Sequence, residues 1–299
     1  MTDETRKGIV TGVFCYLFWG LCPVYWKLLV EVDSLEIIAH RIIWCTVLTV
    51  GVCLVARKNV AALLRNRRAW RILAPAAVLI TFNWGLYIYA VNAGHVVETA
   101  IGYYINPLVS VLLGVIVFRE RLSRLQIVAV ALCAAGVAYF TLSYGQFPLI
   151  AIGLACSFGL YGAFKKKGGY PPVEALAMEN AILIVPVIAF AVGLAFASGH
   201  HAFLGDVATA GGWETTLLLV GAGPVTAIPL LLFSSAANKI PLSMLGFIQY
   251  LSPTLALLLG VFLFGEAFTF SHGVMLACIW SALALVSVDT LRSPKPASR

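Results

Sequence analysis

Long apolar runs separated by short polar breaks make up most of the chain. Ten runs are long enough to cross the hydrocarbon core of a bilayer as helices, which takes about 20 residues each. They lie roughly at 8–29, 34–56, 70–91, 96–118, 123–142, 148–164, 173–197, 213–234, 242–264 and 269–290. Because lipid offers the backbone no hydrogen-bond partners, each run is expected to be helical. The pattern predicts an all-α integral membrane protein with ten transmembrane helices.

The composition agrees with lipid as the solvent. Of the 299 residues, 61% are hydrophobic and only 11% are charged, whereas soluble domains average about 25% charged residues. The first run is followed by more of its kind, so it is expected to stay in the mature chain rather than act as a signal peptide. All seven cysteines fall inside apolar runs without metal-ligand spacing. We expect them to be small buried side chains, and no metal or other cofactor is predicted.

Basic residues gather in alternate breaks between the runs. Those breaks and the two termini hold 18 of the 20 basic residues, and the intervening breaks hold none. The positive-inside rule then places both termini in the cytoplasm. This topology accounts for the net charge of +7, so a nucleic-acid partner is set aside. The three lysines at 165–167 are assigned to one such break, where they fix the topology or hold anionic membrane lipid.

One phrase occurs twice in the chain. Residues 107–120 and 253–266 are identical at seven of fourteen positions, at a separation of 146 residues. We therefore predict two five-helix repeats at 8–142 and 148–291, followed by a cytoplasmic tail at 292–299. Because five is odd, the second repeat enters the membrane in the opposite orientation. Such 5+5 inverted repeats are typical of secondary transporters, whose sites lie between the repeats near the bilayer midplane.

Several short motifs resemble one transporter family. "WGLCPVYWK" at 19–27 fits the first-helix pattern W-G-x6-K of the EamA group of the drug/metabolite transporter superfamily, and "FRER" (118–121) and "FGEA" (264–267) fit the ends of its fourth and ninth helices. Other stretches resemble the RarD branch: "AHRIIW" (39–44), "GYYINPL" (102–108) and "GFIQYLSPT" (246–254). The resemblance implies ten helices, a 5+5 inverted repeat and export of a metabolite or drug.

Arg41 is a charged residue inside the second run. A charge at the centre of a membrane helix costs about 2.5–3.5 kcal/mol on insertion scales, so it normally faces a cavity or a partner. Aligning the second and seventh runs through Glu36 and Glu174 sets Arg41 opposite Glu179. Two interpretations stand: a structural ion pair that braces the two halves, and a functional role in recognising substrate charge or in a proton-coupled switch.

Two prolines mark the repeated runs near the midplane. Pro107 and Pro253 each remove one helix hydrogen bond and free the carbonyl groups of Tyr103 and Gln249. A kinked helix lined by polar side chains in both halves is a sequence pointer to a transport site. The alternative is a packing kink satisfied by a neighbouring helix.

The remaining candidates are polar or aromatic residues inside the runs. Aromatic side chains in a cavity would stack on a flat or cationic solute, although many aromatic residues also form interfacial belts. Glu98 and Glu179 are candidates for proton coupling, with a helix N-terminus as the alternative place for Glu98. Lys27 is expected to snorkel, and Glu120 and Glu266 to be structural. The predicted cavity residues are Trp19, His40, Arg41, Asn83, Trp84, Tyr103, Tyr104, Asn106, Tyr161, Glu179, Asn180, Gln249 and Tyr250.

These features together predict a secondary transporter in the bacterial inner membrane. It would move a small organic solute by alternating access, with export as the expected direction. The chain shows no P-loop for nucleotide hydrolysis, and uniport and proton antiport both fit. The alternative is an intramembrane enzyme acting on a lipid-soluble substrate, but scattered, pseudo-symmetric polar residues fit a transport path better than a reaction centre.

Overall fold

A computed structural model describes residues 2–58, 60–145, 147–198, 202–204, 212–265 and 268–292. Within this part of the chain, ten helical spans are long and apolar enough to cross a membrane, which confirms the predicted number. The spans are α1 (Asp3–Lys27), α2 (Ser34–Val55), α4 (Arg67–Asn92), α5 (Val96–Phe118), α6 (Arg124–Tyr144), α7 (Leu149–Gly168), α8 (Pro172–Ser198), α9 (Gly212–Ala237), α10 (Leu242–Gln249) together with α11 (Leu251–Phe264), and α12 (Phe270–Arg292).

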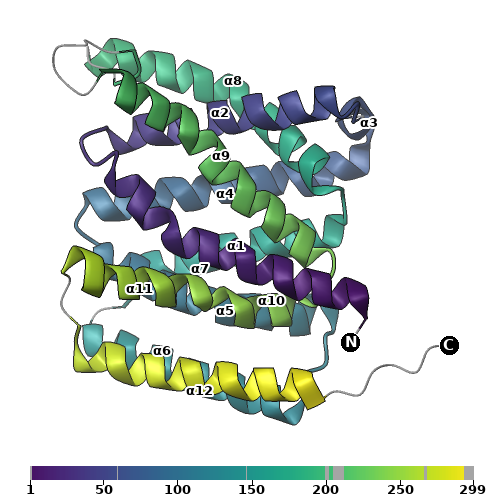
Figure 1. Ribbon diagram of the computed structural model, residues 1–299, viewed down its shortest axis with the longest axis vertical. Coiled ribbons are helices and arrows are strands. Elements are labelled where there is room, and N and C mark those ends of the chain that lie inside the picture. Colours follow the sequence, from purple (N-terminus) through teal and green to yellow (C-terminus); the bar gives the residue numbers. More distant parts are fainter. Residues whose placement is uncertain are drawn as a thin grey trace.

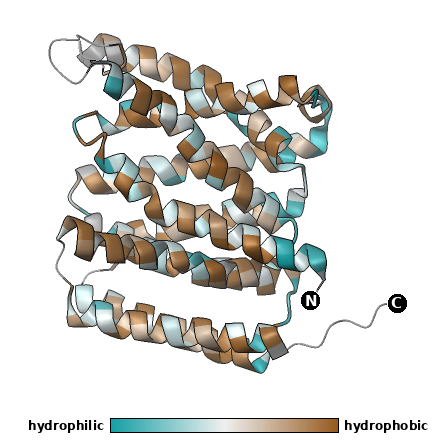
Figure 2. Ribbon diagram, in the orientation of Figure 1, coloured by the Kyte–Doolittle hydropathy of each residue, from teal (hydrophilic) through white to brown (hydrophobic). Residues whose placement is uncertain are grey.

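The helices lie side by side as one elongated bundle (Figure 1). The start of α1 and the end of α12 lie on the same side of the bundle, at the right of Figure 1, as an even number of spans requires. Hydrophobic residues cover most of the length of the helices, and hydrophilic residues gather at the connections (Figure 2). This distribution is what a bilayer core between two aqueous faces demands.

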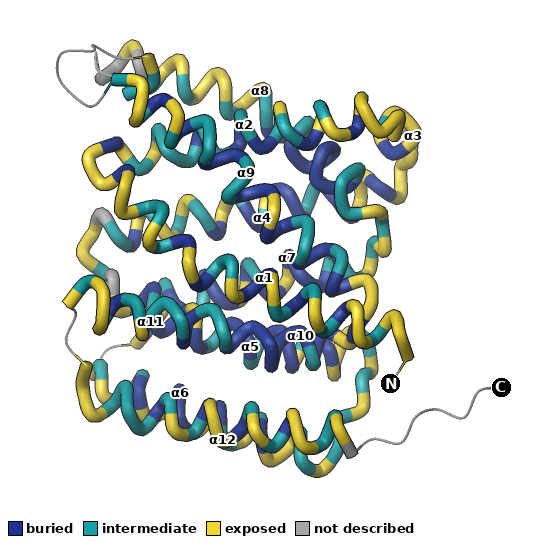
Figure 3. The backbone as a smooth tube through the Cα atoms, viewed as in Figure 1, coloured by how far each residue is buried: buried dark blue, intermediate teal, exposed yellow. Residues whose placement is uncertain are grey.

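Packing partners follow a simple scheme. The helix α7 packs against α4 and α5, while α1 packs against α9 and against α10 and α11. The helix α2 packs against α8 and α9, α5 packs against α10, and α6 pairs with α12 at one side of the bundle. Buried residues concentrate in the middle of the bundle (Figure 3). Tyr16, Tyr161 and Phe233 are among the largest fully buried side chains there.

Several helix starts are encoded locally. Ser123 and Gln126 form a capping box at the start of α6, with the Ser123 hydroxyl accepting from the Gln126 amide. The side chains of Asp33 and Asn66 accept backbone hydrogen bonds at the starts of α2 and α4. Each cap satisfies amide groups that have no partner inside their own helix.

One helix start is completed from a distant segment. The Glu120 carboxylate, just beyond α5, accepts from the backbone amides of Leu242 (2.7 Å) and Ser243 (2.8 Å) and from the Ser243 hydroxyl (2.6 Å). An anion is favoured at this helix N-terminus. Glu120 thus ties the end of α5 to the start of α10, while Glu266 lies outside the described residues.

The two repeated prolines act differently. Pro107 lies inside an uninterrupted α5, whereas the ninth span breaks at Tyr250, between α10 and α11, three residues before Pro253. A short helix, α3 (Val60–Arg65), follows α2 and was not predicted.

The predicted end of the sixth span is wrong. The helix α7 continues to Gly168, so the three lysines at 165–167 belong to its last turns rather than to a solvated break. Lys165 is only 3% exposed. The hydropathy pattern ends at the three lysines because they are charged. It does not reveal that a contact with another helix stabilises Lys165 inside the protein.

Gly223 sets the closest approach of α9 to α2. A Cβ atom there would lie 2.5 Å from both the carbonyl carbon and the Cβ atom of Trp44. We expect Gly223→Ala to destabilise the protein by about 1–3 kcal/mol because the helices must separate. Thermal unfolding of the purified protein in detergent measures this. Gly51→Ala is the matched control, since no described atom lies within 4 Å of its added methyl group; equal effects of the two substitutions would contradict the assignment.

Candidate functional site

The guanidinium group of Arg41 lies between side chains of three other helices. Its central carbon is 4.6 Å from the ring centroid of Trp26 on α1 and 4.6 Å from that of Trp84 on α4. Its Nε donates a 3.0 Å hydrogen bond to the Thr226 hydroxyl on α9. We call Arg41, Trp26, Trp84 and Thr226 the arginine site. Cation–π contacts of this kind stabilise a cation where water is scarce.

Two phenols adjoin the arginine site. Tyr87 on α4 and Tyr103 on α5 have ring centroids 6.0 Å apart, and both interact electrostatically with Arg41. They remain 36% and 47% exposed, respectively. Part of the surface of each tyrosine is therefore not covered by protein atoms.

Arg41 has no acidic partner among the described residues. Every salt bridge found in that part of the chain involves other cations, and Glu179 pairs with Lys165 at 2.7 Å instead. The interpretation of Arg41 and Glu179 as one ion pair bracing the two halves is therefore wrong. Each group has found a separate environment on its own side of the bundle.

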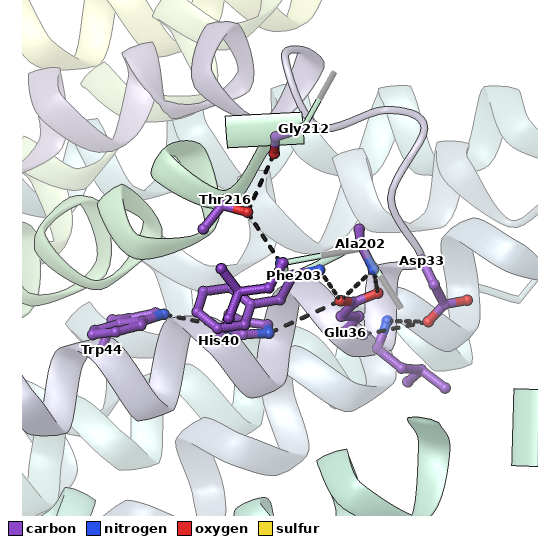
Figure 4. A network of polar contacts seen from close by, with 10 residues as sticks. Asp33, Glu36, His40, Trp44, Ala202, Phe203, Gly212 and Thr216 are labelled. Atoms are coloured by element: carbon purple, nitrogen blue, oxygen red, sulfur yellow. Dashed lines mark hydrogen bonds and ion pairs between the residues drawn. The ribbon is translucent and has the colours of Figure 1, made fainter. Parts of the chain in front are cut away.

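His40 belongs to a polar network at the N-terminal end of α2 (Figure 4). Its Nδ1 accepts from the indole nitrogen of Trp44 (3.1 Å), and its Nε2 lies 3.9 Å from Glu36. The Glu36 carboxylate accepts from the backbone amides of Ala202 (2.8 Å) and Phe203 (3.1 Å). The Phe203 ring lies 4.6 Å from the imidazole. Glu36 and His40 thus hold Ala202 and Phe203 against α2.

Lys165 and Glu179 form a buried ion pair between α7 and α8. Glu179 is 1% exposed, and its second carboxylate oxygen accepts a long hydrogen bond of 3.5 Å from Tyr161. The Lys165 ammonium also lies 5.7 Å from the Tyr161 ring centroid. We call these three residues the lysine–glutamate cluster. A charge pair so far from water is stable only when its partners are complete.

Two of the predicted amides are satisfied by neighbouring helices. The Asn83 side chain donates to the Leu154 carbonyl (2.8 Å) and to the Ser157 hydroxyl (2.9 Å), which joins α4 to α7. Asn180 donates to Cys45 Sγ and to the Thr49 hydroxyl, both at 3.2 Å, which joins α8 to α2. Their observed contacts are interhelical, as is common for amides in membrane bundles.

Gln249 and Tyr104 form further polar contacts where α5 packs against α10. The Gln249 carbonyl oxygen accepts from Tyr16 (3.4 Å) and Ser110 (3.3 Å), and the Tyr104 hydroxyl donates to the Pro253 carbonyl (3.3 Å). Tyr250 is buried beside these residues. The side-chain carbonyl of Asn106, which is 4% exposed, has no hydrogen-bond partner among the described residues.

Two predicted cavity aromatics belong to a closed aromatic core. The Trp19 ring packs at 5.6–5.9 Å from Tyr16, Phe158 and Phe233. Tyr161 stacks on Phe233 at 5.8 Å and is fully buried.

Glu98 serves a helix start. Its carboxylate accepts from the backbone amide of Ile150 in the first turn of α7 (3.1 Å) and lies 3.1 Å from His95 Nδ1. Glu98 therefore plays the same structural part for α7 that Glu120 plays for α10. Lys27, at the end of α1, lies 4.0 Å from the Phe264 ring centroid rather than extending freely.

Sequence reasoning missed Lys165, Thr226 and the role of Tyr87. A signal for Lys165 existed, because only three residues separate α7 from α8 and antiparallel neighbours bring their facing turns together. Thr226 lies between Pro224 and Pro229, the two prolines of α9. The same signal existed for Tyr87 and its partner Tyr103, because three residues also separate α4 from α5. No cluster of metal-ligating side chains was found in the described residues.

The lysine–glutamate cluster gives a stability prediction. We expect Lys165→Met and Glu179→Leu each to cost about 3–5 kcal/mol, because each leaves one buried charge unpaired. The double variant should lose less than either single variant, since no charge remains. Thermal unfolding in detergent measures all three. Lys7→Met, which removes an exposed pair with Asp3, is the control and should leave the midpoint unchanged; additive losses in the double variant would contradict the coupling.

Comparison with known proteins identifies the family. The profile of the EamA-like transporter family matches the chain twice, over residues 6–142 and 147–288. The chain is 42% identical over 295 residues to the uncharacterized transporter YojE of Bacillus subtilis, covering 97% of this chain and 96% of that protein. It is also 42% identical over 296 residues to the protein RarD of Streptomyces exfoliatus, covering 98% and 92%.

A solved crystal structure shares the fold. It superposes with a TM-score of 0.73 at 17% identity, covering 95% of this chain and 99% of the other. The ten spans and these relatives make the chain a multi-pass membrane protein, and the relatives are transporters rather than enzymes. The chain belongs to the EamA-like transporter family, and its near full-length relatives include proteins named RarD.

Proposed function

We propose that the protein is a secondary transporter that carries a small organic solute across the bacterial cytoplasmic membrane by alternating access. Export is the proposed direction. The observation that carries the proposal is the arginine site, where a cation with no acidic partner in the described part of the chain contacts helices from both halves of the chain. Arg41 comes from α2 in the first half, and Thr226 comes from α9 in the second.

This mechanism includes the proposal that the two halves of the chain form an inverted repeat, and the packing of the helices supports it. In such a repeat, α1 corresponds to α7, α4 corresponds to α9, and α5 corresponds to α10 with α11. The helix contacts of one half then match those of the other half. The contact of α1 with α9 corresponds to that of α7 with α4, and the contact of α1 with α11 to that of α7 with α5. The two separate matches to one family profile also support a duplicated unit. Two units of opposite orientation can form a site that opens to either side.

The two pseudo-equivalent charges lie in different environments. Arg41 and Glu179 each follow the first residue of their helix by seven positions, in α2 and α8. Arg41 adjoins the partly exposed Tyr87 and Tyr103, whereas Glu179 is sealed by Lys165 and Tyr161. A carrier open on one side requires such an asymmetry. We propose that the lysine–glutamate cluster closes the cytoplasmic half in this conformation and that Glu179 takes part in coupling when that half opens.

The proposed topology predicts which connections face the cell exterior. Single cysteines placed at Ala93 and Phe268 should react with a membrane-impermeant maleimide in intact cells. Cysteines at Lys58 and Lys239 should react only after the cells are permeabilised, because these connections carry the positive charges. The native cysteines are removed first. Labelling of Lys239→Cys in intact cells would contradict the inverted arrangement of the second half.

Flux in proteoliposomes tests transport itself. A panel of small organic solutes is assayed with and without a pH gradient, and at least one should show saturable flux. Arg41→Ala should reduce this flux by about tenfold or more, given what a buried charge contact contributes. Lys7→Met is the control that should transport at the normal rate. Acceleration by a pH gradient would identify proton coupling, and equal flux in Arg41→Ala and wild type would contradict the assignment of the site.

A further inference from the structure

We propose that the arginine site binds the carboxylate group of an anionic solute, held edge-on by the Nη atoms of Arg41 between the indoles of Trp26 and Trp84. This inference rests on the proposed transport function and names the chemical class of its substrate. It differs from stacking of an aromatic or cationic solute, which the aromatic residues alone favour.

The first argument is the unused hydrogen-bonding capacity of Arg41. A guanidinium group carries five N–H donors in a fixed plane. Among the described residues, Nε alone has a hydrogen-bond partner, the Thr226 hydroxyl at 3.0 Å, and no acceptor is found for the four N–H groups on the Nη atoms. Those four donors form the edge that matches the two oxygens of a carboxylate.

The second argument is the direction of approach. The indole rings of Trp26 and Trp84 each have their centroid 4.6 Å from the central carbon of the guanidinium. These rings obstruct a ligand that would stack on the guanidinium. The edge bearing the Nη atoms remains for a ligand, and a planar anion fits this edge better than a flat neutral ring.

The third argument is charge. Lys165 and Glu179 neutralise each other at 2.7 Å, whereas no described carboxylate neutralises the positive charge of Arg41. A cation in this position repels a cationic solute and is stabilised by an anionic one. Tyr87 and Tyr103 have exposed surface next to this charge. Their hydroxyl groups are donors that can contact a carboxylate or a polar group beside it.

Binding of matched probes tests the proposal without any measurement of flux. The probes are phenylacetate, phenylacetamide and phenethylamine, which share one ring and differ in charge, together with acetate. Thermal unfolding of the purified full-length protein is followed in detergent, because a ligand of the folded state raises the midpoint with its concentration. We expect phenylacetate to raise the midpoint and the amide and amine to leave it unchanged.

Variants of Arg41 distinguish binding from a structural role. Arg41→Gln should abolish the phenylacetate shift, and Arg41→Lys should weaken apparent binding by about tenfold, because a lysine lacks the planar fork. Without a probe, the Arg41→Gln midpoint should stay within about 2 °C of the wild type or rise, since no acidic group loses its partner. The control is Lys27→Gln, at the end of α1 and outside the arginine site. It should retain the phenylacetate shift.

Three results would overturn the proposal. They are an equal or larger shift with phenethylamine, a phenylacetate shift that persists in Arg41→Gln, and no shift with either acetate or phenylacetate. These outcomes are separable from failure of the transport proposal. Flux of a neutral or cationic solute without carboxylate binding would support the transport proposal and contradict the carboxylate assignment. Carboxylate binding without any flux would support the carboxylate assignment and contradict the transport proposal.

Discussion

The absence of hydrogen-bond partners in lipid is the constraint on which the whole structure depends. Every backbone amide and carbonyl in the hydrocarbon core must be satisfied within the chain, and ten helical spans accomplish most of this. The remaining unsatisfied groups lie at helix starts and breaks. There the protein uses carboxylates from neighbouring helices, as Glu98 does for α7 and Glu120 does for α10. Glu98, a candidate for proton coupling from the sequence, is thus an interhelical cap, as is Glu120, which was expected to be structural.

The same constraint separates the buried charges into two kinds. Lys165 and Glu179 neutralise each other within a cluster closed by Tyr161, so removing either partner would strand a charge away from water. Arg41 instead has two indoles, one hydroxyl and no carboxylate among the described residues. A complete pair is an arrangement that holds helices together. An incomplete one is an arrangement that a ligand can complete, and this difference is why we place recognition at Arg41.

Polar residues near the middle of the bundle also divide by accessibility. Asn83, Asn180 and Gln249 join helices through hydrogen bonds, and Trp19 and Tyr161 belong to the aromatic core. Tyr87 and Tyr103 keep exposed surface near Arg41. The residues that carry the candidate chemistry are therefore fewer than the polar residues of the spans. They come from α1, α2, α4, α5 and α9, which places both halves of the chain around one group.

The sequence alone determined the ten spans and the resemblance to the EamA group, because an apolar run of about 20 residues has only one stable form in lipid. It also singled out Arg41, Glu179 and Tyr103, since a polar group inside such a run is rare. The partners of these residues follow from how the helices pack. Lys165 looked like part of a solvated break, yet the fold buries it against Glu179. Thr226 reaches Arg41 from α9, 185 residues along the chain, and Trp26 reaches it from the preceding helix α1. Periodicity and composition describe how each helix meets lipid, but which side chains meet across helices depends on packing geometry, which a one-dimensional pattern does not contain.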